Sequence, residues 1–130
     1  MNRTEMREQA FVLLFEKEFF KDKPAHEIEE IYSENMAALS DYAKEVFENT
    51  VLHKDEFDEI IERYSNGWKL NRIPKVNLSI LRLALYEIIY VDGVPENVAI
   101  NEAVELAKKY SGKEDFAFIN GILGSYSRSK

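Results

Sequence analysis

The chain has 130 residues, no cysteine, 45% hydrophobic residues and a formal net charge of −7. This length and apolar content suit a single domain, residues 1–130, with its own hydrophobic core. The lack of cysteine excludes disulfides, thiolate zinc sites and cysteine nucleophiles, and it fits a cytoplasmic location.

Charge is distributed unevenly along the chain. Residues 1–67 hold 8 Lys and Arg against 17 Asp and Glu, a net of −9, whereas residues 68–130 hold 9 against 7, a net of +2. An acidic surface repels a phosphate backbone at long range, so nucleic-acid contact requires a local basic patch or a basic partner protein. The longest apolar stretch, residues 76–91, is interrupted by Arg82 and Glu87, and the charged N-terminus lacks the apolar core of a signal peptide. We therefore expect no membrane segment and no export.

The first half of the chain predicts four helices joined by short turns. The first covers about residues 4–20, with Asn2 as N-cap and Glu5 completing a capping box. The second covers residues 27–39 and has an acidic outer face. Ser40 is the expected N-cap of a helical stretch to residue 65, which we expect to break near residues 53–55. Asn66-Gly67 supplies a left-handed C-terminal end.

The second half predicts three more helices. The helix over about residues 75–91 is apolar nearly all round, which predicts that it is buried at the centre of the fold, and Pro74 fits its first turn or the turn just before it. A sixth helix ends near residue 110. A seventh covers residues 115–125, where Gly124 and the following serines predict an early end. The fold class is therefore all-α, a compact bundle of about seven helices around a central helix at about residues 75–91.

Two charges inside the central helix, Arg82 and Glu87, are surrounded by apolar residues. Burial of either charge without a partner would cost several kcal/mol. Each must therefore pair internally or reach the surface.

No motif in the chain indicates catalysis. His26 and His53 lack the spacing of metal ligands, and there is no glycine-rich phosphate loop or nucleophile elbow. Glu102 has no histidine or second carboxylate at catalytic spacing, and we expect it in the first turn of its helix, where the dipole favours an anion. We expect no enzyme activity, no cofactor and no metal site.

Three blocks in the second half carry a family resemblance. They read LRLALYE at residues 81–87, VAINEAVELAKKY at 98–110 and FING at 118–121, and REQAFVLLF at 7–15 adds a shorter match in the same order. In these blocks the chain resembles the NusB family of transcription antitermination factors. The resemblance implies a seven-helix bundle that binds boxA leader RNA together with NusE, a small-subunit ribosomal protein. It also implies a role in an antitermination complex on RNA polymerase.

Four residues are candidates for RNA contact. Arg3 and Arg7 are four apart, so a helix places them on one side as a small cationic patch, with a solvated helix start as the alternative. Phe118 lies two residues after Phe116, so the two point about 200° apart and one of them should be exposed. The resemblance implies that Phe118 stacks on an unpaired base while Asn120 reads a base edge. The alternative is that Phe118 packs in the core and Asn120 faces water.

The resemblance also implies a partner surface near Phe15, Asn77 and Leu81, although Phe15 fits the apolar stripe of its helix equally well. Two other functions remain open. The chain could be a free-standing relative of the NusB-like domain that precedes some rRNA methyltransferase domains, or a helical scaffold that binds basic proteins without RNA. The sequence leaves monomer and homodimer both open.

Overall fold

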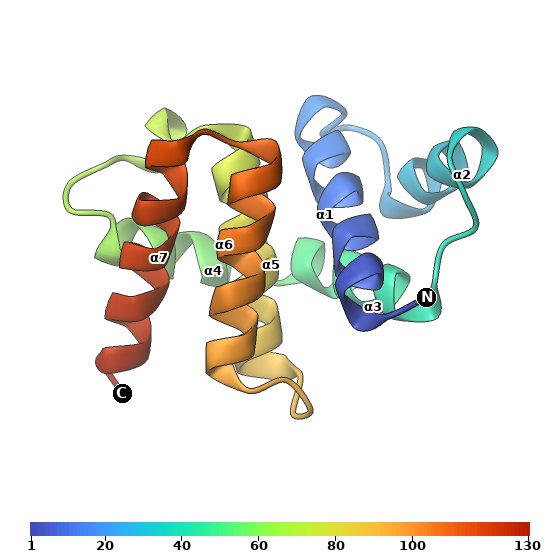
Figure 1. Ribbon diagram of the computed structural model, residues 1–130. Coiled ribbons are helices and arrows are strands. Elements are labelled where there is room, and N and C mark those ends of the chain that lie inside the picture. The colour runs from blue at the N-terminus through green and yellow to red at the C-terminus, as the bar shows by residue number, and fades with distance from the viewer.

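The computed structural model describes all residues, 1–130, as helices joined by short loops (Figure 1). The elements in chain order are α1 (Arg3–Phe19), α2 (Ala25–Asn35), α3 (Asp41–Leu52), α4 (Lys54–Tyr64), the short 3-10 turn η1 (Leu70–Arg72), α5 (Lys75–Tyr90), α6 (Glu96–Tyr110) and α7 (Lys113–Arg128). The prediction of an all-α bundle of about seven helices is confirmed.

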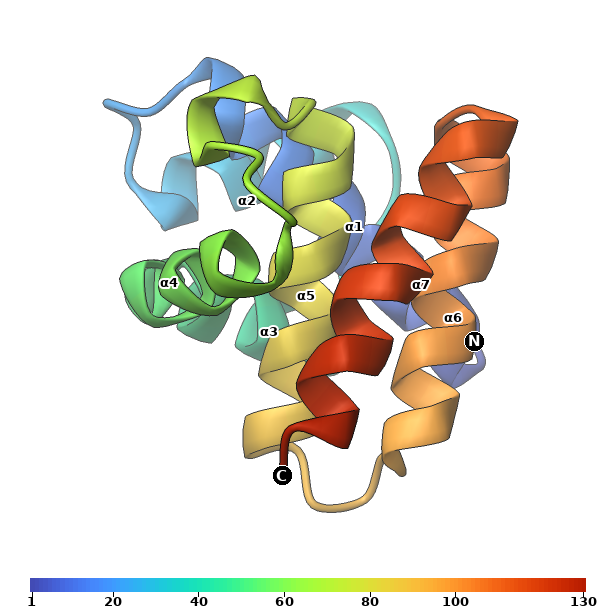
Figure 2. The same ribbon diagram turned by 90° about the vertical axis from the view of Figure 1, so that its left-hand side faces the viewer.

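Helix α5 is the centre of the bundle. It packs against α1, α3, α4, α6 and α7, and every residue from 77 to 87 is buried. Figure 1 shows α1, α2 and α3 grouped to one side of α5, and Figure 2 shows α6 and α7 side by side on another. The predicted central position of this helix follows from its nearly uniform apolar surface, which must be covered on most sides.

The predicted helix caps are present. The Asn2 side chain accepts a hydrogen bond from the Glu5 amide at 2.8 Å, and the Glu5 carboxylate accepts one from the Asn2 amide at 3.1 Å. Ser40 caps α3 by accepting from the Ala43 amide at 3.1 Å. Asn66 and Gly67 have φ values of 54° and 87°, so the left-handed end after α4 is confirmed.

Helix α2 ends earlier than predicted, at Asn35 rather than near residue 39. The amide of Gln9 explains the difference, because it donates to the Ala38 carbonyl at 3.0 Å and accepts from the Ser40 amide at 3.1 Å. This side chain from α1 braces a non-helical connection between α2 and α3. Leu39 still packs against the core, although it lies outside the helix.

Helix α7 runs through Gly124 to Arg128, so the predicted early end is wrong. Its last turns are held against the start of α6, because the Ser127 hydroxyl donates to Glu96 at 2.7 Å and Lys130 also pairs with Glu96. No helix in the structure is both long enough and apolar enough to cross a membrane.

Candidate RNA and partner interface

The two arginines of the predicted RNA patch have different surroundings. The Arg3 guanidinium is exposed and lies over the Tyr42 ring, 4.0 Å from its centroid. Arg7 is 3% exposed and is enclosed between α1, α5 and α6. The expected exposed patch made of both arginines is therefore wrong, because Arg7 is used inside the fold. Only Arg3 presents its charge to solvent.

The Arg7 cluster, which we define as Arg7, Glu87, Glu102 and Tyr42, ties four helices together. Arg7 Nε lies 2.6 Å from Glu87 Oε1, and Arg7 Nη1 lies 2.9 Å from Glu102 Oε1. The Tyr42 hydroxyl donates to the other oxygen of Glu87. Burial alone would lower the pKa of the Arg7 guanidinium, but the hydrogen bond and charge of Glu87 raise it above its usual value. The arginine therefore stays charged inside the protein.

Glu102 also differs from the sequence expectation. Helix α6 starts at Glu96, so Glu102 lies in its second turn rather than its first. Its carboxylate accepts from Arg7 and from the Thr4 hydroxyl instead of neutralising the helix N-terminus. Its contribution here is structural.

Phe118 lies at the edge of a hollow between α7 and the segment after α4. The hollow has a volume of about 250 Å³, and its lining includes Trp68, Phe118 and Arg128, which together we call the aromatic hollow. Phe118 is half-buried and meets the exposed Trp68 ring edge-on, with centroids 6.1 Å apart. Arg128 has no carboxylate partner within ion-pair distance, so an unpaired cation lines the same hollow as the two rings. This combination suits an unpaired nucleotide.

Asn120 is exposed, but it lies on another face of α7 and does not line the aromatic hollow. Two residues along a helix turn a side chain by about 200°, so Phe118 and Asn120 cannot serve one base as the sequence analysis expected. Asn120 shares its face with Phe116, whose half-buried ring lies 5.5 Å from the Lys108 ammonium.

Trp68 is the residue of this surface that sequence reasoning missed. Two features of the sequence could have identified it: it is the single tryptophan, and it directly follows the Asn66-Gly67 turn. A large aromatic residue on a polar loop is a candidate for binding.

Phe15 belongs to a row of aromatic rings along α1. Its ring stacks on Phe11 at 6.0 Å and meets the exposed Phe19 edge-on at 5.0 Å. Phe11 is buried and contacts Tyr110 of α6 at 4.8 Å. We call the outer part of this row, Phe15, Phe19 and Tyr110, the aromatic ridge. Phe15 is half-buried, so it contributes to both the core and the surface.

Asn77 and Leu81 are buried, which corrects the expectation that they lie on the partner surface. The Asn77 side-chain amide donates to Asp115 at 3.1 Å, and its oxygen lies 3.0 Å from the oxygen of the Ser111 hydroxyl, which donates to Asp115 at 2.7 Å. Hydrogen bonds from Ser111, the Gly112 amide and Asn77 lower the pKa of Asp115. Asn77 therefore fixes the turn between α6 and α7 to the start of α5.

Comparison with known proteins identifies the family of this arrangement. The sequence model of the NusB family matches residues 4–128. The chain belongs to the NusB family. It is 44% identical to the transcription antitermination protein NusB of Thermoanaerobacter sp. (strain X514), with 100% of this chain and 93% of that protein covered. Identity with the NusB protein of Acetivibrio thermocellus is 45%, with coverage of 100% and 91%.

Solved NusB structures have the same fold. T. maritima NusB superposes with a TM-score of 0.84 at 34% identity, covering 98% of this chain and 92% of that chain. A crystal structure of the antitermination factors NusB and NusE in complex with dsRNA contains a chain with a TM-score of 0.85 at 26% identity, covering 98% and 97%. The helix arrangement described above is thus the NusB family fold along almost the whole chain.

Proposed function

We propose that this chain is a transcription antitermination factor that binds boxA-type leader RNA together with a NusE ribosomal protein. The observation that carries the proposal is the likeness, over 98% of the chain, to a NusB chain in a structure with NusE and dsRNA. The activity is binding rather than catalysis. We further propose that the resulting complex acts on RNA polymerase in the cytoplasm, notably on rRNA operons.

The RNA surface in this proposal combines Arg3 with the aromatic hollow. Arg3 supplies an exposed cation for a phosphate, while Trp68 and Phe118 supply faces on which bases can stack. These groups give few cationic contacts in a chain with a net charge of −7, so RNA binding by the chain alone should be weak.

The partner surface in this proposal is the aromatic ridge. Phe19 is 57% exposed and Tyr110 is 39% exposed, which is unusual for rings of this size unless something covers them. The first 67 residues carry a net charge of −9, so a basic protein is attracted to this half of the chain. A basic partner would also add its own cations to the RNA surface, which makes the complex the RNA-binding species. Self-association through the ridge is the alternative occupant, and sedimentation over a range of concentrations separates the two.

The deciding experiment is a competition between boxA RNA and a scrambled RNA of equal length, performed with and without NusE. The proposal predicts preference for boxA and tighter binding when NusE is present. Equal binding of both RNAs would favour the methyltransferase-type accessory, and absence of RNA binding under both conditions would favour the scaffold.

The aromatic hollow is tested by Phe118→Ala. We expect RNA binding to weaken by about 1–3 kcal/mol, because one stacked base loses its platform. Phe116→Ala is the matched control, since it removes a half-buried ring from another face of the same helix. Equal losses in the two folded variants would show that the hollow has no special role.

The aromatic ridge is tested by Phe15→Asp, with helix content checked by circular dichroism. We expect NusE binding to be lost, because a charge would be placed among the rings of the interface. Phe20→Asp is the control, since Phe20 is an exposed ring just past the end of α1 and has no aromatic partner in the ridge. Normal NusE affinity of a folded Phe15→Asp protein would move the partner surface elsewhere.

A further inference from the structure

A cleft on another side of the molecule gathers lysines on this acidic chain. It consists of two adjoining cavities of about 130 and 480 Å³, which share Glu18, Lys21, Lys54 and Arg82. Five lysines from four segments of the chain line it, and we call this region the lysine cleft: Lys17, Lys21, Lys54, Lys69 and Lys75. The lysine cleft is formed by α1, the α3–α4 junction, η1 and the start of α5.

None of these five lysines forms an ion pair, whereas Lys23, Lys108, Lys109 and Lys130 all do. Only the ammonium of Lys17 has a protein partner, the Lys21 carbonyl at 2.9 Å. With Arg82 the lysine cleft holds six cations against the three carboxylates of Glu18, Glu62 and Asp58, a local net charge of +3. On a chain of −7 this is a concentration of unused positive charge.

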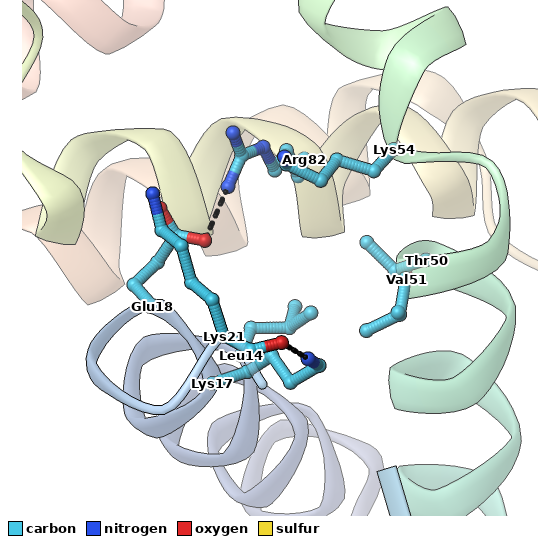
Figure 3. Close-up of a pocket in the computed structure, with 8 residues that line it drawn as sticks. All are labelled: Leu14, Lys17, Glu18, Lys21, Thr50, Val51, Lys54 and Arg82. Carbon is cyan, nitrogen blue, oxygen red and sulfur yellow. Dashed lines mark hydrogen bonds and ion pairs between the residues drawn. The ribbon is translucent and has the colours of Figure 1, made fainter. Parts of the chain in front are cut away.

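The inner wall of the lysine cleft contains a buried polar group without a protein partner. Thr50 is completely buried, and its hydroxyl has no hydrogen-bond partner. Figure 3 shows Thr50 and Val51 across the cavity from the residues of α1, and it shows Glu18 paired to Arg82. Leaving a buried hydroxyl unpaired is costly, so such a group points to an unseen acceptor.

The N-terminus of α5 is a further source of positive charge in the lysine cleft. Lys75 is the first residue of this helix, which has no side-chain cap and no acidic residue in its first turn. No side chain of α5 itself therefore neutralises the partial positive charge of this helix terminus.

From these observations we propose that the lysine cleft binds phosphate groups, either of a free oligophosphate or of a nucleic-acid backbone. Arg82 is the one guanidinium in the lysine cleft, and it already pairs with Asp58 at 2.7 and 3.1 Å and with Glu18 at 3.1 Å. It therefore has no free pair of N–H groups with which to bind an incoming carboxylate through two hydrogen bonds. Separate lysine ammoniums along an extended cavity fit an anion with several charged centres. No aromatic residue lines either cavity, so bases would not stack there. This surface is separate from the aromatic hollow and the aromatic ridge.

Calorimetric titration of the whole protein with inorganic tripolyphosphate, and separately with an unstructured oligouridylate, tests the proposal. The cleft variant is Lys21→Gln/Lys75→Gln, and the matched control is Lys44→Gln/Lys113→Gln. The control removes the same charge from two exposed lysines without ion pairs, one of them also the first residue of a helix. We expect about tenfold weaker binding in the cleft variant and a change of less than about twofold in the control.

The probe whose binding is weakened in the cleft variant but not in the control identifies the source of the phosphate. Tripolyphosphate represents a free anion, and oligouridylate represents a nucleic-acid backbone. Thr50→Val should weaken binding of the same probe without lowering the melting temperature, because it removes a hydroxyl that makes no bond inside the protein. Equal losses in the two lysine variants, or no binding of either probe, would overturn the proposal. So would an oligoglutamate peptide that competes as well as tripolyphosphate, since the cleft would then select acidic peptides.

Discussion

Two buried arginines link α1 and α5, and one belongs to each helix. Arg7 extends from α1 to Glu87 of α5, whereas Arg82 extends from α5 to Glu18 of α1 and also to Asp58 of α4. The Arg7–Glu87 pair is enclosed, with side-chain exposures of 3% and 1%, whereas Glu102, the second partner of Arg7, is 21% exposed. The Arg82 pairs open toward the lysine cleft, and their carboxylates keep exposures of 9% and 12%.

This difference in enclosure should determine how much each arginine matters for stability. A carboxylate left without its cation in a closed interior has no water to replace it, whereas one at the wall of a cleft can regain water or meet a nearby lysine. Similar ion pairs in one helix bundle are therefore not equivalent. Their surroundings decide the cost of breaking them.

The largest effect is expected for Arg7→Met, which leaves Glu87 and the half-buried Glu102 without their cation. We expect a loss of about 3–5 kcal/mol in the free energy of unfolding, measured by urea denaturation. Arg63→Met is the control, because Arg63 is an exposed arginine with a loose ion pair to Glu59 at 3.9 Å, and it should change stability by less than about 0.5 kcal/mol. A loss for Arg7→Met no larger than the control would contradict the structural role given to the Arg7 cluster.

A smaller loss, about 2 kcal/mol, is expected for Arg82→Met in the same assay. Glu18 lines the same two cavities as Lys21 and Lys54, so these ammonium groups can approach its carboxylate once the guanidinium is gone. If Arg82→Met proves more destabilising than Arg7→Met, enclosure is not what separates the two arginines.

Glu29 of α2, in contrast, is a buried carboxylate that no arginine holds. One of its oxygens has no hydrogen-bond partner, and burial together with the neighbouring Glu48 carboxyl raises the pKa of Glu29 to about 7. The folded state therefore binds the proton of the Glu29 carboxyl group more tightly than the unfolded state does. The stability that the protonated group provides is complete below about pH 4.5 and is lost as the pH rises to about 7.

The amide of Glu29→Gln cannot lose a proton, so the variant should not lose stability as the pH rises to about 7. It should be more stable than the wild type by about 1–2 kcal/mol above pH 7. Urea denaturation at a series of pH values measures the difference. Glu30→Gln, an exposed neighbour on the same helix, provides the control. If the two variants have the same pH profile, Glu29 is not the group responsible.

Only some of the interface residues predicted from the sequence are accessible in the structure. Arg3, Phe118 and Phe15 are at least partly accessible, as a surface role requires, whereas Arg7, Asn77 and Leu81 are buried. Helical spacing alone could not separate these groups, because it shows which residues share a face but not what covers that face. Arg7 is covered because Glu87 and Glu102, 80 and 95 residues away in the chain, arrive beside it. The lysine cleft escaped the sequence for the same reason, since its lysines come from four separate segments.

Four features could be predicted from the sequence: the helices, most of their caps, the central place of α5 and the need for Arg82 and Glu87 to find partners. These features depend on local hydrogen bonds, on apolar periodicity and on the cost of burying a charge, all of which can be evaluated within a few turns of chain. The ends of α2 and α7 depend on tertiary contacts, because Gln9 and Glu96 reach those segments from the preceding helices, about 30 residues away in the chain. The tertiary structure also decided which charges became internal ties and which stayed free. That choice depends on which side chains meet in space, and no local pattern in the sequence specifies it.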